Sequence, residues 1–79
     1  MQPLVYAWRT RVGTFQIALG QRGWMLVFDD EVFDGPFRTA QHALDDLAWG
    51  HCAWPSCGDT SQFGMSDDIG EWTVARRAR

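Results

Sequence analysis

The first part of the chain alternates between apolar and polar or small side chains, the pattern of a half-buried β-strand. This alternation predicts one strand over 4–11 and a second over 14–19, separated by Val12-Gly13. The glycines of Gly20-Gln21-Arg22-Gly23 predict a hairpin loop, because they supply the positive φ angles that tight turns require. The nearly continuous apolar run 24–28 then predicts a central strand.

Two weaker strand signals follow. Asp29-Asp30-Glu31 ends the third strand, and Val32-Phe33 is predicted as a short edge strand before Asp34-Gly35-Pro36. A last short strand is predicted over 72–75. The chain therefore carries three or four clear antiparallel strands.

One helix is predicted after this sheet. Thr39 is a suitable N-cap, and an apolar stripe recurs at i, i+3, i+4 and i+7. Asp45 and Asp46 fall on the opposite side of the helix, and Gly50 is well placed to end it. The residues of the apolar stripe are Ala40, Ala43, Leu44 and Leu47.

The segment from 51 to 64 is rich in Pro, Gly, Ser, Asp and Thr, which predicts a loop. Ser66 is predicted to cap a single helical turn through Ile69. The expected fold is thus α+β: a three- to four-stranded antiparallel sheet, one α-helix packed across one face, and a long C-terminal loop. This layout is similar to that of small bacterial YegP-type domains, but layout does not carry function.

Several short motifs between Gly13 and Trp72 resemble a group of small uncharacterised proteobacterial and phage-associated proteins. The matching motifs are Gly13-x-Phe15, Trp24-x-x-x-Phe28-Asp29-Asp30-Glu31, Ala43-Leu44-Asp45-Asp46-Leu47, Gly50-His51, Pro55-Ser56, Asp59-Thr60-Ser61, Gly64 and Asp68-Ile69-x-x-Trp72. The resemblance supports the fold, and it implies no catalytic residue. The arginine-rich tail lies outside it.

Length and composition limit the organisation of the chain. Its 79 residues are expected to form a single domain over 1–79, with a partly disordered tail over 72–79. There is no apolar stretch of about 20 residues and no signal-peptide pattern, so we expect a cytoplasmic protein with free thiols and no membrane contact. A small core with five Trp is also compatible with a homodimer.

The net charge of −3 hides a strong segregation of charge along the chain. Ten acids and one base, Arg38, lie between Asp29 and Glu71. The other arginines precede or follow this block, at Arg9, Arg11, Arg22, Arg76, Arg77 and Arg79. Such an acidic block attracts basic partners and repels the phosphates of nucleic acids.

The candidate chemistry is sparse. His51, Cys52 and Cys57, with His42 on the preceding helix, form the most metal-like cluster. Their spacing lacks the paired close ligands typical of zinc sites, and nothing predicts a lowered thiol pKa. The acidic runs also lack the spaced pattern of a calcium loop. We therefore expect no catalytic residues, no metal and no cofactor, and a protein that is not an enzyme.

These observations favour a non-enzymatic protein-interaction module that binds a protein with a basic surface. Its most specific form is a phage or mobile-element inhibitor, similar to anti-CRISPR proteins, of a nucleic-acid-binding complex. The acids supply charge complementarity, and two Trp expected to be exposed supply anchors. The predicted partner-binding residues are Asp29, Asp30, Glu31, Asp45, Asp46, Trp49, Trp54, Asp67 and Asp68.

Two alternatives stay open. One is direct binding of nucleic acid through the sheet and the arginines of the strands and the tail, which requires those arginines to gather away from the acids. The other is a small metal or thiol site at His51, Cys52 and Cys57.

Overall fold

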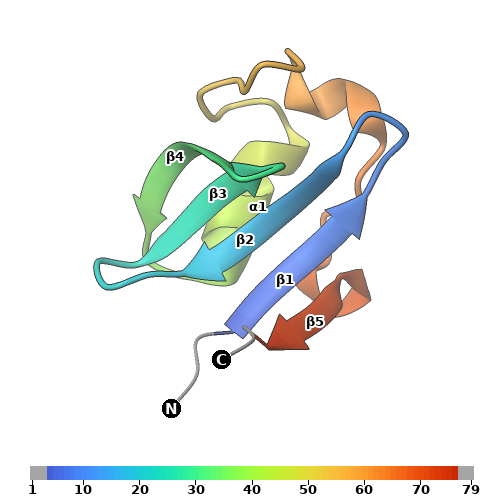
Figure 1. Cartoon of the computed structure of the whole chain (residues 1–79). Helices are drawn as coiled ribbons and strands as arrows, with labels where there is room; N and C mark the ends of the chain where they lie inside the picture. Colours follow the sequence, from blue (N-terminus) through green and yellow to red (C-terminus); the bar gives the residue numbers. More distant parts are fainter. Residues whose placement is uncertain (1–3, 77–79) are drawn as a thin grey trace.

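The structure is a computed structural model that describes residues 4–76, and it contains one antiparallel sheet of five strands. In the sheet the strands have the order β4-β3-β2-β1-β5, so β2 lies at its centre (Figure 1). The strands are β1 (Leu4–Arg9), β2 (Thr14–Leu19), β3 (Trp24–Phe28), β4 (Glu31–Phe37) and β5 (Thr73–Arg76).

The register of the strands collects large apolar side chains on one face of the sheet. Trp8 of β1 pairs with Phe15 of β2, and Phe15 pairs with Phe28 of β3. Because side chains alternate between faces, Tyr6, Ile17 and Leu26 lie on the same face in the next pairs. Phe15, Ile17 and Leu26 are fully buried, so this face forms the core.

Helix α1 (Ala40–Ala48) lies across this face, behind the sheet in the view of Figure 1. The predicted N-cap is confirmed, since the backbone N–H of His42 donates to the Thr39 hydroxyl oxygen at 3.0 Å. The predicted end is also confirmed, because Gly50 adopts a φ of 73° directly after the C-cap residue Trp49. All four residues of the predicted apolar stripe are buried: Ala40, Ala43, Leu44 and Leu47.

The sequence predicted a loop over 51–64, but the long segment after α1 is not all loop. It contains two short 3-10 helices, η1 (Thr60–Phe63) and η2 (Ile69–Glu71). Asp59 caps η1 and Asp68 caps η2, so the prediction that Ser66 caps a helical turn is wrong. Ser66 instead donates its hydroxyl proton to the Glu71 carboxylate and accepts from the backbone N–H of Asp68.

A buried hydroxyl joins η1 to α1. Thr60 is fully buried, and its hydroxyl donates to the Leu47 carbonyl at 2.6 Å in the last turn of α1. The same hydroxyl oxygen lies 3.6 Å from the Cys52 sulfur. This pair of contacts fixes the C-terminal segment against the helix, because a buried polar group loses its water and must find a partner in the protein.

The α+β class with one helix on an antiparallel sheet is confirmed, but the strand count exceeds the prediction. The first strand ends at Arg9 rather than position 11, and the edge strand β4 continues through Asp34-Gly35-Pro36 to Phe37. Register shifts interrupt the β3–β4 pairing near Leu26, which allows these three residues within a strand.

The short strand predicted over 72–75 is present as β5 (Thr73–Arg76), which pairs with β1 and places Thr73 opposite Ala7. The strand lies within the segment 72–79, for which a partly disordered tail was expected. The remainder of the predicted tail, residues 77–79, lies outside the described residues.

The other face of the sheet carries no helix among residues 4–76 (Figure 1). Its side chains are small, apolar or uncharged toward the middle, with Ala7, Gln16 and Ala18 in paired positions. Arg9 lies on this face at the end of β1. Within the same residues, no helix has the length and apolar character needed to cross a bilayer.

We expect Thr60→Val to lower the free energy of unfolding by about 1–3 kcal/mol, because the variant keeps the side-chain shape and removes the shorter of the two hydrogen bonds to the Leu47 carbonyl, leaving the one from the Gly50 N–H at 3.2 Å. Urea denaturation followed by far-ultraviolet circular dichroism measures this change. Thr60→Ser, which retains the hydroxyl, serves as the control and should lose less stability than Thr60→Val. An equal or larger loss in the Ser variant would contradict a dominant role for the hydrogen bond.

Candidate functional site

The acidic run at the end of β3 forms a tight turn. Phe28 pairs with Glu31, so Asp29 and Asp30 are the two loop residues of the β3–β4 hairpin, with φ angles of 45° and 74°. The Thr14 backbone N–H donates to Asp29 Oδ1 at 2.9 Å, and the Asp29 N–H donates to the Thr14 carbonyl at 3.1 Å. Asp29 therefore has a structural role in holding this turn against β2.

The next acids anchor the segment that follows α1. Glu31 accepts from the Ser56 hydroxyl at 3.1 Å, and Asp34 Oδ2 accepts from the Ala53 backbone N–H at 2.9 Å. These bonds join the start of β4 to residues 19–25 positions later in the chain. Sequence reasoning assigned Glu31 to partner binding, whereas the structure gives its carboxylate an internal partner.

A second group of acids lies on the outer side of α1, where the Gln41 side chain hydrogen-bonds to Asp45 and Asp67. The Gln41 side-chain amide N–H donates both to Asp45 Oδ1 and to the Asp67 carbonyl, each at 2.8 Å. Its amide oxygen accepts from the Ile69 backbone N–H at 3.2 Å. The Asp67 backbone is thereby linked through Gln41 to the Asp45 side chain, although the two residues are 22 positions apart in the sequence.

Both predicted anchors are exposed, at one end of α1. Trp49 and Trp54 have 64% and 57% of their surface accessible, while the other three Trp are buried or half-buried. The Trp54 indole N–H donates to the Gly50 carbonyl at 3.1 Å, which places this indole next to the residue that follows Trp49. The pair therefore stands where the helix ends.

An open groove of about 270 Å³ lies beside the first of these indoles. It is lined by Ala48, Trp49, Met65, Ser66 and Asp67. We call Asp45 together with these five residues the Trp49 surface. Gln41, Met65 and Ser66 were not predicted; the spacing of Gln41 and Asp45 at i, i+4 is the one sequence signal for this arrangement.

Asp46 and Asp68 are placed differently from their neighbours. Successive residues of a helix are rotated by about 100°, so Asp46 points to another side of α1 than Asp45 does. The carboxylate of Asp46 contributes to raising the pKa of the Cys52 thiol, which locates it toward that side. Asp68 accepts from the Gly70 backbone N–H at 2.9 Å and so caps η2.

The metal-like cluster of the sequence is not assembled. Cys52 is buried against Thr60, His51 is exposed, and His42 packs edge-on against Phe37 with ring centroids 5.3 Å apart. Burial raises the pKa of the Cys52 thiol, and the nearby carboxylates of Asp34 and Asp46 raise it further. Among residues 4–76, no group of three or more His, Cys, Asp or Glu side chains is arranged to hold a metal ion.

The arginines are divided between the two ends of the sheet. Arg9 and Arg11 lie at the β1–β2 connection, which Thr14 joins to the Asp29 turn. Arg22 lies in the β2–β3 connection, and Arg38 follows Phe37, which pairs with Trp24 at that same end. Arg9 and Arg11 therefore lie at the end of the sheet opposite to Arg22 and Arg38, and the tail positions Arg77 and Arg79 lie outside the described residues.

Comparisons of the chain with protein-family models, curated proteins and solved structures give no significant match.

Asp30→Gly should stabilise the fold by up to about 1 kcal/mol, because a two-residue hairpin with two positive φ angles favours Gly at its second loop position. Thermal unfolding by calorimetry would show a higher midpoint. Glu31→Gln, next to the turn but in the extended region, is the matched loss of charge and should give no such gain. A destabilised Asp30→Gly variant would mean that the carboxylate makes a contact worth more than the backbone strain.

At neutral pH, iodoacetamide should alkylate Cys57 well before Cys52, because Cys52 is buried and burial raises the pKa of both thiols. Mass spectrometry of timed samples separates the two sites, and in denaturant their rates should converge. The folded state holds the protons of these thiols more tightly than the unfolded chain does. The contribution of the two thiols to the free energy of unfolding is therefore fully present below the unfolded-state pKa, and it is lost as the pH rises through the folded-state pKa. If Cys52 of the folded protein reacted as fast as a free thiol, this result would contradict the prediction and favour the alternative of a thiol site at Cys52.

Proposed function

We propose that this protein is a non-enzymatic interaction module whose Trp49 surface binds a basic segment of another protein. The observation that carries the proposal is the exposed Trp49 indole beside an open groove that Asp67 also lines. A soluble domain gains nothing by exposing the largest apolar side chain, whereas exposed Trp residues are frequent binding hot spots.

The chemistry of this surface suits arginine and lysine side chains. A guanidinium or ammonium group lies favourably over the face of an indole, and Trp is the best aromatic residue for this interaction. Asp45 and Asp67 supply carboxylates on the two segments that Gln41 joins, and a carboxylate pairs strongly with a guanidinium or ammonium group of a basic segment. Met65 and Ala48 offer an apolar floor for the aliphatic stem of such a side chain.

The other predicted partner-binding acids contribute less to this proposal. Asp29, Glu31 and Asp68 already accept hydrogen bonds that hold a turn, a loop and a 3-10 helix. Asp30 and Asp46 add negative potential, which steers a basic partner toward the molecule without contacting it at the groove. Trp54 extends the aromatic surface at the end of α1.

The narrower form of this function is the inhibition of a nucleic-acid-binding complex by occupation of its basic groove. The resemblance to small phage-associated proteins and the acidic, Trp-bearing surface both support it. Such an inhibitor competes with nucleic acid for the same basic residues, so its binding weakens as nucleic acid is added.

We expect Trp49→Ala and the double variant Asp45→Asn/Asp67→Asn to lose the partner that the wild-type protein retains. Immobilised wild-type protein captures that partner from a bacterial lysate, and mass spectrometry identifies it. Isothermal titration with the purified partner should then show at least about tenfold weaker binding for Trp49→Ala, which is the scale of a buried aromatic hot spot. The double variant should also show a smaller dependence of binding on salt.

Asp30→Asn is the control, since it removes one negative charge at the β3–β4 turn, and Asp30 does not line the groove. It should bind the partner nearly as tightly as the wild-type protein. The proposal fails if all variants retain the same proteins as the wild type, or if Asp30→Asn weakens binding as much as the changes at the groove do.

A further inference from the structure

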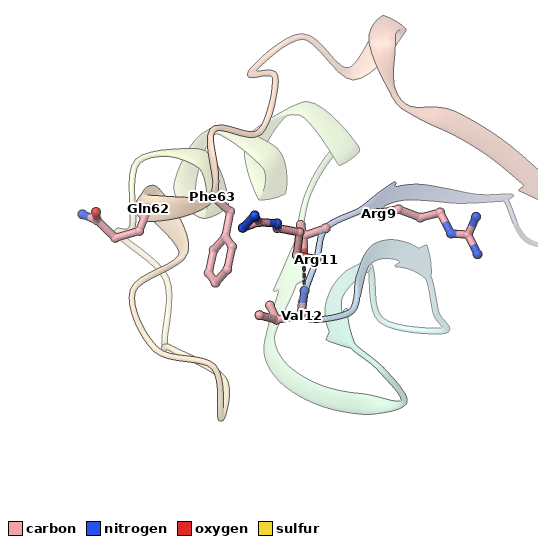
Figure 2. Close-up of a pocket in the computed structure, with 6 residues that line it drawn as sticks. Arg9, Arg11, Val12, Gln62 and Phe63 are labelled. Atoms are coloured by element: carbon pink, nitrogen blue, oxygen red, sulfur yellow. Dashed lines mark hydrogen bonds between the residues drawn. The ribbon is translucent and has the colours of Figure 1, made fainter.

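The largest of the three grooves described on this molecule lies away from the Trp49 surface, between the β1–β2 connection and η1. It is open, has a volume of about 720 Å³, and is lined by Arg9, Thr10, Arg11, Val12, Gln62 and Phe63. Figure 2 shows the Arg11 and Val12 side chains pointing toward the Phe63 ring, whereas Arg9 and Gln62 point outward on opposite sides. A cation and an aromatic ring therefore face each other across an open space.

Thr10 closes the connection that presents Arg11, since its backbone N–H donates to the Gly13 carbonyl at 2.8 Å and its hydroxyl makes three further contacts. Thr10 donates from its side-chain oxygen to the Gly13 carbonyl at 2.8 Å. The same oxygen accepts from the backbone N–H groups of Val12 and Gly13, each at 3.2 Å. Arg11 and Val12 thus stand at the tip of a closed loop, and their backbone requires little further ordering when a ligand binds.

The opposite wall is equally fixed. Phe63, at the end of η1, packs against the buried Phe15 ring with centroids 5.4 Å apart, and it stays partly exposed toward the groove. Val12 has 55% of its surface exposed beside it. A rigid aromatic ring with an apolar neighbour can accept a flat apolar group by stacking.

Arg9 connects this groove to a second hollow of about 290 Å³, because it lines both. The second hollow includes Ala7, Thr14 and Thr73, which lie on the face of the sheet without a helix, and it ends at Glu71. The two spaces therefore meet at Arg9, and together they make a path from Phe63 past Arg11 and Arg9. Two adjoining spaces in succession suit an extended polymer better than a compact molecule.

We propose that this path, named here the Arg11 groove, binds single-stranded nucleic acid, with phosphates at Arg11 and Arg9 and an unpaired base against Phe63. Guanidinium groups recognise phosphates, and aromatic side chains stack bases without regard to sequence. A base can reach the ring only when it is unpaired, so duplexes are excluded. An acidic peptide would satisfy the arginines but leave the aromatic wall without a matching group.

The charge of the chain predicts how this binding behaves. Asp29 at the neighbouring turn, Glu71 at the end of the path and the net charge of −3 all oppose a polyanion. With two phosphate contacts on single-stranded nucleic acid, the slope of log affinity against log salt should be about −1.4. Binding is therefore weak and is measured at low ionic strength.

Fluorescence anisotropy with a labelled oligothymidylate, titrated at several salt concentrations, tests the proposal. Arg11→Gln should weaken binding and reduce the salt slope by about 0.7, the value of one lost phosphate contact. Phe63→Leu, which keeps an apolar side chain against Phe15, should weaken binding at least about fivefold and leave the salt slope unchanged, since it removes stacking alone. Circular dichroism confirms that each variant is folded.

The matched control is Arg22→Gln, which removes the same charge at the opposite end of the sheet. It should leave affinity and slope nearly unchanged. An Arg22→Gln variant as weak as Arg11→Gln would mean unspecific attraction and would overturn the proposal. Absence of binding by the wild-type protein at low salt would also overturn it.

Two competitors identify the chemistry of the ligand. Unlabelled thymidine monophosphate should compete much more weakly than the oligonucleotide, because it offers one phosphate to a path with two arginines. Polyglutamate should compete poorly, since it cannot stack on Phe63. Equal competition by either compound would replace this proposal with a nucleotide site or a general anion site. Trp49→Ala should bind the oligonucleotide like the wild type, which separates this groove from the proposed protein-binding surface.

Discussion

One aromatic ring at the centre of the sheet holds the surrounding elements together. Phe15 is fully buried, with ring centroids 4.8 Å from Phe28 on β3, 6.4 Å from Phe33 on β4 and 5.4 Å from Phe63 on η1. In a chain of 79 residues the core has few layers, so each large ring carries a large share of the apolar burial. The same contact sets the wall of the Arg11 groove, because Phe63 is held where Phe15 places it. The core and the Arg11 groove therefore depend on the same packing of Phe63 against Phe15.

The acidic block of the sequence has a largely local explanation. Asp29 holds a turn, Glu31 and Asp34 fasten the segment after α1, and Asp59 and Asp68 cap 3-10 helices. Hydrogen bonds from the Ser61 side chain and backbone lower the pKa of Asp59, as expected for a capping carboxylate. Short polar elements need such acceptors because their backbone N–H groups have no partners of their own. Charge segregation in a sequence therefore overstates the number of carboxylates that lack a hydrogen-bond partner within the protein.

The sequence predicted what depends on neighbouring residues and missed what depends on distant ones. The alternation of 14–19, the Thr39 cap, the helical stripe and the exposure of Trp49 and Trp54 follow from local patterns, and the structure confirms them. The full length of β4 was missed because Asp34-Gly35-Pro36 has the composition of a turn, and only pairing with β3 keeps it extended. Likewise, η1 depends on the bond from Thr60 to the Leu47 carbonyl across 13 positions, and the Trp49 surface depends on Gln41 reaching Asp67 across 26. No window of neighbouring residues contains that information.

The strand register determines which charged side chains lie near side chains of opposite charge. Arg9 pairs with Thr14, whose backbone bonds to Asp29, so the arginine-bearing connection and the acidic turn share one end of the sheet and offset each other. The helix Ala40–Ala48 and the segment 65–68 contain Asp45, Asp46, Asp67 and Asp68 and no arginine or lysine. Their negative potential has no built-in counter-charge in either segment. For this reason the proposed binding surface lies on the outer side of α1 rather than at the longer acidic run of the turn.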